Sequence, residues 1–163
     1  MSTTYERVRE VFAYDPETAT VTWLVATSNR VKVGDRAGSL NNGGDGYRRI
    51  CIDGRGYLEH RLIWRWMTGS WPAAQIDHIN GDRSDNRWAN LREATNAQNL
   101  ANRGANKNNT SGFKGVSRFR QRWQASITKD GRQIHSVYDT PEAAHAAYVA
   151  AANELHGEFA RVK

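Results

Sequence analysis

A run of polar residues divides this chain. From Arg103 to Gly112 the sequence RGANKNNTSG contains no apolar side chain except one alanine. Such a segment has nothing to bury, so its composition favours a flexible connection over a packed element. In a chain of 163 residues, this favours small modules on either side. We therefore place a domain boundary here and expect a linker over residues 104–112.

Composition narrows the class of partner. The formal net charge of +6 and the isoelectric point near 9.8 favour a polyanion, nucleic acid first and an anionic membrane surface second. Cys51 is the single cysteine, which excludes an internal disulfide and a cysteine-rich zinc site. No apolar run reaches the length of a membrane span, and the N-terminus lacks the pattern of a signal peptide. We therefore expect a cytoplasmic protein that does not enter a membrane.

The sequence before the linker predicts a β-hairpin followed by a helix. YRRICID and GYLEH, residues 47–53 and 56–60, flank a turn signal. From Leu58 onward, apolar residues recur at helical spacing. His60 and Arg61 lie at the start of this helix. We expect them to be a solvated or core-edge pair and not part of a functional site.

The sequence after the linker predicts three strands and a helix. Short runs rich in β-branched and aromatic residues fill positions 113–138. Thr140 is the expected N-cap of the helix and Pro141 its first residue. Strands followed by one helix, without crossover helices, predict an antiparallel sheet that the helix covers on one side. The expected fold class of the whole chain is α+β.

The stretch IDHINGDRSDNRWANLREATNAQN, residues 76–99, is unusually rich in asparagine. It predicts two short strands joined by an elaborated loop and closed by a helix that Thr95 caps. Asparagine rarely fills a core, because its amide needs several hydrogen-bond partners. Two interpretations are open: a polar loop tied together by local hydrogen bonds, or the cradle of a metal-dependent active site. Asn86 is interpreted as a residue that only ties the loop.

The same stretch offers ligands for a hard cation. We expect Asp77 on the first strand and Asn99 on the helix to lie close together. A carboxylate and an amide oxygen suit Mg²⁺ or Mn²⁺, which keep waters and accept phosphate oxygens in the remaining positions. His78 follows Asp77 directly, so the two side chains point to opposite faces of a strand unless the pair lies at a strand end.

Residues 75–103 resemble the HNH endonucleases, in the ββα-metal form of phage homing endonucleases, whose motif ends in asparagine. The resemblance implies that His78 is the general base, that Asp77 and Asn99 bind one catalytic metal, and that Asn90 pins the loop and orients His78. It further implies hydrolysis of DNA to a 5′-phosphate and a 3′-hydroxyl in the cytoplasm of a bacterial host.

Basic residues accumulate around and after the linker. Eight lysines and arginines lie between Arg103 and Arg132, against one acidic residue. Arg118, Arg120 and Arg122 alternate, so we expect them to project from one face of a strand, and such a cationic sheet face can enter a major groove of DNA. The residues expected to contact DNA are Lys114, Arg118, Arg120, Arg122, Trp123, Lys129 and Arg132, together with Arg48 and Arg49 before the linker.

Residues 111–162 resemble the DNA-binding domain named for the plant Apetala and ethylene-response factors. Trp123, Tyr148 and the helix start at Thr140 and Pro141 fit that pattern. Ser117 stands near a position where plant members have arginine, so the plant target preference does not transfer.

These patterns together predict four parts. Residues 1–72 form a hairpin-and-helix region packed on the nuclease, 73–103 the HNH ββα-metal motif, 104–112 the linker, and 113–163 a three-stranded antiparallel sheet packed on one helix. The leading hypothesis is a homing endonuclease that acts as a monomer on double-stranded DNA, without an evident protein partner, using one divalent metal, Mg²⁺ first and Mn²⁺ second. The alternatives are a DNA-binding regulator with an inactive nuclease segment, and a structural or RNA-binding module.

Overall fold

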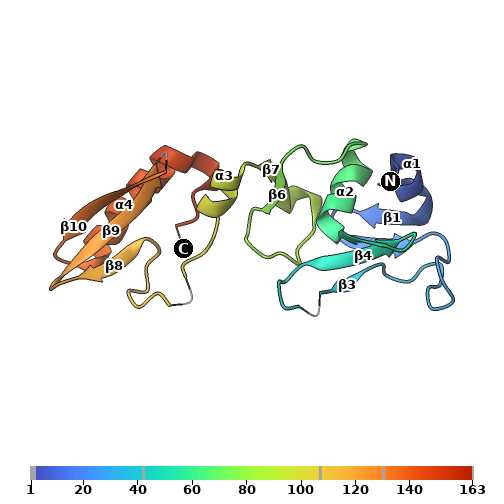
Figure 1. Ribbon diagram of the computed structural model, residues 1–163, viewed down its shortest axis with the longest axis horizontal. Coiled ribbons are helices and arrows are strands. Elements are labelled where there is room, and N and C mark those ends of the chain that lie inside the picture. Colours follow the sequence, from blue (N-terminus) through green and yellow to red (C-terminus); the bar gives the residue numbers. More distant parts are fainter. Residues whose placement is uncertain (1–2, 42, 107, 130, 163) are drawn as a thin grey trace. The chain divides into compact units, whose positions relative to one another are not determined.

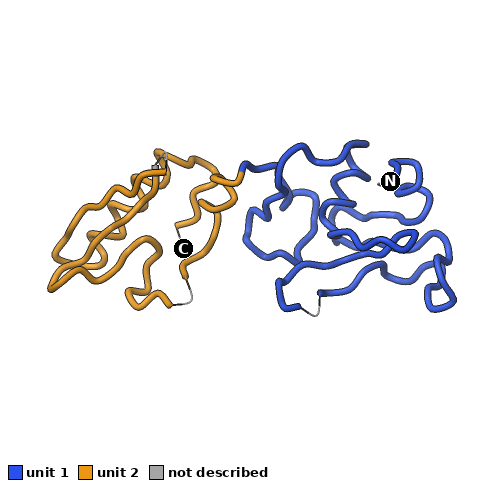
Figure 2. Tube along the Cα trace, in the orientation of Figure 1, with its two compact units in different colours: residues 1–95 blue, residues 96–163 orange. Residues whose placement is uncertain are grey.

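The computed structural model describes residues 3–41, 43–106, 108–129 and 131–162, without the side chain of Lys129 (Figure 1). The chain divides into two compact units, Met1–Thr95 and Asn96–Lys163 (Figure 2). Each unit has its own hydrophobic core. None of the helices that the structure describes is long and apolar enough to cross a membrane.

The first unit opens with a helix and two small sheets. Helix α1 (Tyr5–Val11) leads into the antiparallel pair β1 (Phe12–Asp15) and β2 (Thr20–Trp23). A second sheet has the order β3 (Ser39–Leu40), β4 (Arg48–Ile52), β5 (Arg55–Leu58), and helix α2 (Glu59–Thr68) follows β5 directly. The predicted hairpin and the helix after it are therefore confirmed.

The asparagine-rich stretch forms a hairpin with a long loop. Strands β6 (Gln75–His78) and β7 (Leu91–Ala94) pair antiparallel, and the short 3₁₀ helix η1 (Trp88–Asn90) precedes β7. Both predicted strands are confirmed. The intervening loop, which we call the polar loop, covers residues 79–87.

One core joins this hairpin to the rest of the first unit. Ile50 of β4 and Leu62 and Ile63 of α2 are almost fully buried, and Ile76 of β6 and Leu91 of β7 belong to the same cluster. Burying an aliphatic side chain of this size contributes about 1.5–3 kcal/mol. The region before the motif is therefore the scaffold on which β6 and β7 are held.

The second unit is a sheet covered by a helix. Its elements are α3 (Asn96–Ala101), β8 (Val116–Phe119), β9 (Arg122–Lys129), β10 (Arg132–Tyr138), α4 (Pro141–His156) and η2 (Gly157–Phe159). The strands pair antiparallel in the order β10-β9-β8, and α4 contacts all three. Thr140 caps α4 by accepting a hydrogen bond from the Ala143 amide. The α+β fold class and the capped helix are confirmed.

Helix α3 belongs to the second unit, where it contacts α4 and η2. The Lys114 ammonium ties this region together by donating to the carbonyl oxygens of Ala101 and Arg161, at 2.6 and 2.8 Å. The predicted helix that carries Asn99 is thus present, but it is grouped apart from β6 and β7. The division into residues 1–72, 73–103, 104–112 and 113–163 stays a prediction.

Candidate active site and nucleic-acid interface

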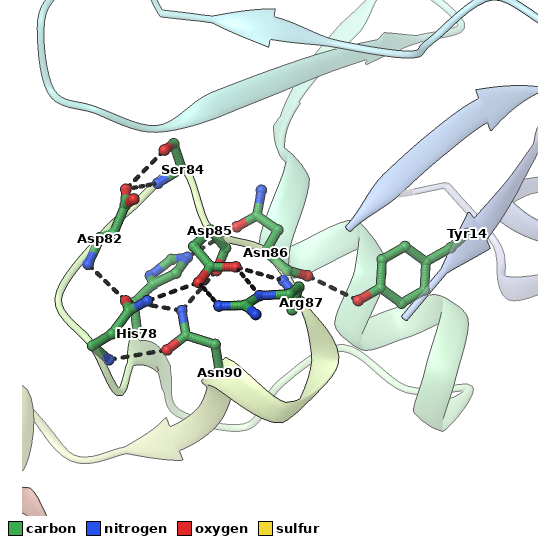
Figure 3. A network of polar contacts seen from close by, with 9 residues as sticks. Tyr14, His78, Asp82, Ser84, Asp85, Asn86, Arg87 and Asn90 are labelled. Atoms are coloured by element: carbon green, nitrogen blue, oxygen red, sulfur yellow. Dashed lines mark hydrogen bonds and ion pairs between the residues drawn. The ribbon is translucent and has the colours of Figure 1, made fainter. Parts of the chain in front are cut away.

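His78 is the last residue of β6, where the polar loop begins. Its side chain is buried, and its Nε2 lies 2.9 Å from Oδ1 of Asn86 (Figure 3). Burial lowers the pKa of His78, while the bond to Asn86 and nearby carboxylates, Asp77 first, act in the opposite direction. A neutral imidazole at physiological pH follows, which is the form that accepts a proton.

Asn86 does more than tie the polar loop, which corrects its expected role. It is fully buried, and its Nδ2 donates to Oε1 of Glu59 at 3.0 Å. Its backbone carbonyl accepts a hydrogen bond of 2.8 Å from the Tyr14 hydroxyl, which Figure 3 shows. Asn86 therefore lies between His78 and a buried acid that the sequence analysis did not single out.

Glu59 is the first residue of α2 and has no exposed surface. Its Oε2 forms an ion pair with Nε of Arg48 at 3.0 Å, and Arg48 also donates to the Gly38 carbonyl at 2.9 Å. The burial of Glu59 could have been predicted from the sequence, because Glu59 precedes the core residue Leu62 by three positions and so shares its helix face. Arg48, expected to contact DNA, is directed inward, and we remove it from the candidates.

His60 is buried beside His78 and is not a solvated or core-edge residue. The two rings meet edge to face at 5.1 Å, and the Tyr47 ring lies 5.1 Å from His60 and 6.0 Å from His78. Within the part of the chain that the structure describes, Nδ1 of His60 has no hydrogen-bond partner. Burial first, and then repulsion from His78 and Arg61, lower the pKa of His60 to about 3.

This buried histidine predicts acid sensitivity of the first unit. The folded-state pKa of His60 lies below the ordinary value of 6.5, so the unfolded chain binds more protons between the two values. The free energy of unfolding is then largest above pH 6.5 and falls toward pH 3, by up to about 1.4 kcal/mol per pH unit. Denaturant unfolding followed by tryptophan fluorescence measures it, since five of the six tryptophans lie in the first unit. A His60→Phe variant should show a shallower pH dependence; an unchanged slope would contradict the assignment.

Asp77 forms a buried ion pair across the ladder. Its Oδ2 lies 3.0 Å from both Nε and Nη2 of Arg92, its direct partner on β7. Carboxylate and amide oxygens are donors that hard cations prefer, so Asp77 and Asn99 have suitable chemistry, but a cation at Asp77 would share the carboxylate with Arg92. Asp77 belongs to the first unit and Asn99 to the second, so their joint coordination of a metal stays a prediction. Among the described residues, no three His, Cys, Asp or Glu side chains are grouped to hold a metal ion.

Asn90 ties the polar loop to the start of β7. Its Oδ1 accepts a hydrogen bond from the backbone N–H of Asn80 at 2.9 Å, and its Nδ2 donates to the backbone carbonyl oxygen of Asp85 at 2.7 Å (Figure 3). The expected pinning of the loop matches these bonds. The described hydrogen-bond partner of His78 Nε2, however, is Oδ1 of Asn86. Both ends of the Asn90 amide bond within the loop, and its role in orienting His78 stays a prediction.

The arginines after the linker do not share one face, contrary to our expectation. Strand β8 ends at Phe119 and β9 begins at Arg122, with Arg120 in the turn at φ 55°. Arg118 pairs with Trp123, and its guanidinium lies 4.9 Å from the centroid of that ring. Arg122 pairs with Phe119 and so projects from the opposite face. The alternation fails because the chain reverses between the first and last arginine.

The sheet face opposite α4 carries several polar side chains beside the exposed apolar residues Phe119 and Val137. Trp123 and Ala125 point toward the helix-covered core, so alternation directs Arg122, Gln124 and Ser126 outward. Arg122 is about half exposed and pairs with Asp139 at 2.8 Å. Gln124 and Ser126 both contact Nδ1 of His135 on β10. Apart from Arg122, these outward residues were missed, although the alternation around Trp123 was a signal that could have found them.

The remaining basic candidates differ in availability. Lys114 is directed into its own unit, and burial lowers its pKa to about 8, so we remove it from the DNA-contacting set. Arg132 is exposed, and Arg49 is exposed with Asp45 as an ion-pair partner at 3.4 Å. The side chain of Lys129 lies outside the described part of the chain.

Residues 57–101, which run from β5 through the motif to α3, match the family described as HNH endonuclease. This chain belongs to the HNH endonuclease family. It is 34% identical to protein 3.8 of Escherichia phage T7 over 108 residues, which cover 64% of this chain and 88% of the phage protein. It is 36% identical to an uncharacterized HNH endonuclease of Acanthamoeba polyphaga mimivirus over 106 residues, 62% of this chain and 54% of that protein. No solved structure matches.

The family match confirms the class of protein that the motif predicts. The matched segment contains His78, Asn86 and Asn90 together with the whole of α2. It ends before residues 111–162, so the resemblance of that segment to the Apetala-type domain stays a prediction.

Proposed function

We propose that this protein hydrolyses phosphodiester bonds of double-stranded DNA, with His78 as the general base. The observation that supports this best is the placement of His78: its imidazole is buried at a strand end, with Nε2 held by Asn86 and the polar loop beside it. General-base assistance from such a group is worth about 10²–10⁴ in rate. Homing behaviour, a monomeric state and action in the host cytoplasm belong to the same proposal.

Each proposed site residue has a separate role in the reaction. His78 accepts the proton of the attacking water, and Asn90 keeps the polar loop closed behind it. HNH nucleases generally use a divalent metal; Asp77 and Asn99 would hold it, Mg²⁺ first and Mn²⁺ second, through oxygen atoms. Such a cation, when bound, stabilises negative charge on the phosphate and on the departing 3′ oxygen.

DNA affinity is proposed to come mainly from the second unit. The outward face of its sheet carries Arg122, Gln124 and His135, groups that can hydrogen-bond to phosphates or base edges. Arg132 adds an exposed positive charge at the start of β10. Arg49 adds another exposed positive charge in the first unit. Phosphate contacts of this kind make binding weaker as salt concentration rises.

Removal of divalent metal is expected to abolish cleavage. Supercoiled plasmid incubated with the protein and Mg²⁺ should become nicked or linear, and excess chelator should leave it supercoiled, because phosphate chemistry of this class depends on a cation. Restoring Mg²⁺ after chelation is the control for irreversible damage to the protein. Mn²⁺ in place of Mg²⁺ should also support cleavage.

A lack of cleavage would distinguish a nuclease from a DNA-binding regulator. Plasmid that stays supercoiled with either metal, although the protein shifts DNA in a gel, would identify a DNA-binding regulator with an inactive nuclease segment. Equal cleavage with and without chelator would contradict the metal assignment.

A further inference from the structure

We propose that a chain of buried polar contacts from Glu59 through Asn86 selects the tautomer of His78 in which Nε2 carries the proton and Nδ1 accepts one. Glu59 and Asn86 are then positioning residues, which act on the reaction through His78. The use of Nδ1 as the catalytic base rests on the proposed function. The tautomer itself is a property of the folded chain and is measured without DNA.

The orientation of the Asn86 amide is the first step. An amide has one end that only accepts and one that only donates, so its neighbours decide which way it faces. The Asn86 Nδ2 lies 3.0 Å from Oε1 of Glu59, whose other oxygen is paired with the Arg48 guanidinium. A carboxylate in such an ion pair accepts hydrogen bonds and donates none, so the NH₂ group of Asn86 faces Glu59.

The tautomer of His78 follows from that orientation. With Nδ2 turned to Glu59, Oδ1 of Asn86 faces Nε2 of His78 at 2.9 Å. An oxygen acceptor at this distance requires a proton on Nε2. In a neutral imidazole the lone pair is then on Nδ1, because the hydrogen bond at one ring nitrogen sets the state of the other.

The surroundings hold this arrangement in one orientation. Glu59 and Asn86 have no exposed surface, and His78 is 4% exposed. A Cβ atom at Gly38 would lie 2.7 Å from Oε2 of Glu59, so the acid has little room to move. Reversing the Asn86 amide would make two acceptors face each other in a buried site, which is strongly disfavoured.

Three variants test whether the hydrogen-bond direction along the chain from Glu59 to His78, and not its packing, selects the His78 tautomer. Glu59→Gln keeps the shape but offers either an oxygen or an NH₂ group to Asn86, so both orientations of the Asn86 amide, and both His78 tautomers, become populated. Asn86→Ala removes the acceptor at Nε2. Tyr14→Phe is the matched control, because it deletes a buried hydrogen bond to Asn86 while leaving the polarity of the chain from Glu59 to His78 intact.

Long-range ¹H–¹⁵N spectra of the ¹⁵N-histidine-labelled full chain, in chelator at neutral pH, read the tautomer directly. Loss of one of the five histidine signal sets in His78→Gln assigns His78. The parent and Tyr14→Phe should show protonated Nε2, and Glu59→Gln and Asn86→Ala a mixture or the reverse. A protonated Nδ1 in the parent overturns the proposal, as do parent-like spectra in both variants or a mixture in Tyr14→Phe. If Glu59→Gln fails to fold, the parent spectrum and Asn86→Ala still decide.

The rate of DNA nicking under single-turnover conditions is the second test of the proposal. Glu59→Gln should slow the step at saturating enzyme by about tenfold or more, with an unchanged Kd for DNA, because only the base is affected. A parent without nicking activity would refute the proposed function, while the spectra would still decide the tautomer. Parent-like rate and spectra in Glu59→Gln would refute the positioning role even if the parent cuts DNA.

Discussion

Replacing His78 with alanine is expected to lower the rate of DNA nicking by about 10²–10⁴, the usual contribution of a general base. DNA affinity should be nearly unchanged, because the candidate phosphate contacts lie elsewhere in the chain. The imidazole is buried between Asn86 and His60, so its loss removes the proton acceptor without removing surface charge. Plasmid nicking under single-turnover conditions measures the rate, and a gel-shift titration measures the affinity.

The variant needs two controls. Loss of the ring leaves the buried Oδ1 of Asn86 without its donor, which costs about 1–3 kcal/mol of stability, so a melting curve should accompany each assay. His156→Ala, a histidine in the last turn of α4, is the matched substitution outside the proposed site. A folded His78→Ala protein that cuts at the parental rate would exclude His78 as the base.

Gly115→Ala is expected to unfold the second unit. Gly115 adopts φ +72°, and a Cβ atom there would lie 2.2 Å from two ring atoms of Tyr148, a buried residue of α4. The left-handed backbone costs about 1–2 kcal/mol for a residue with a Cβ atom, and overpacking a core typically adds about 1–3 kcal/mol. Together these costs are comparable to the whole stability of a small unit.

Gly112→Ala separates the two costs, because Gly112 has φ +78° but nothing within 4 Å of a Cβ atom. Amide proton spectra should show native signals of the first unit in Gly115→Ala and loss of those of the second, while Gly112→Ala keeps both. DNA affinity should fall strongly in Gly115→Ala, since the proposed binding sheet is lost. Equal melting temperatures for the two variants would show that Tyr148 gives way to the added methyl group.

Local pattern predicted most of the secondary structure. Strands β4 to β7, the helix after the hairpin, and the cap at Thr140 each depend on residues close together in sequence, so hydrogen bonding and periodicity specify them locally. Arg118, Arg120 and Arg122 were placed wrongly because the chain turns at Arg120. Their spacing is compatible with one strand or with a tight turn, and only the pairing of Arg118 with Trp123 distinguishes the two.

The sequence by itself determined the class of this protein: Asp77, His78, Asn90 and Asn99, in their order and with the predicted strands and helix, were enough to indicate an HNH endonuclease. Only the tertiary structure decided which side chains surround His78. Glu59 and His60 come from α2, and Tyr14 from β1, yet they lie in the same buried region as the polar loop. Buried polar contacts depend on packing between segments distant in sequence, and such packing has no periodic signature in the chain.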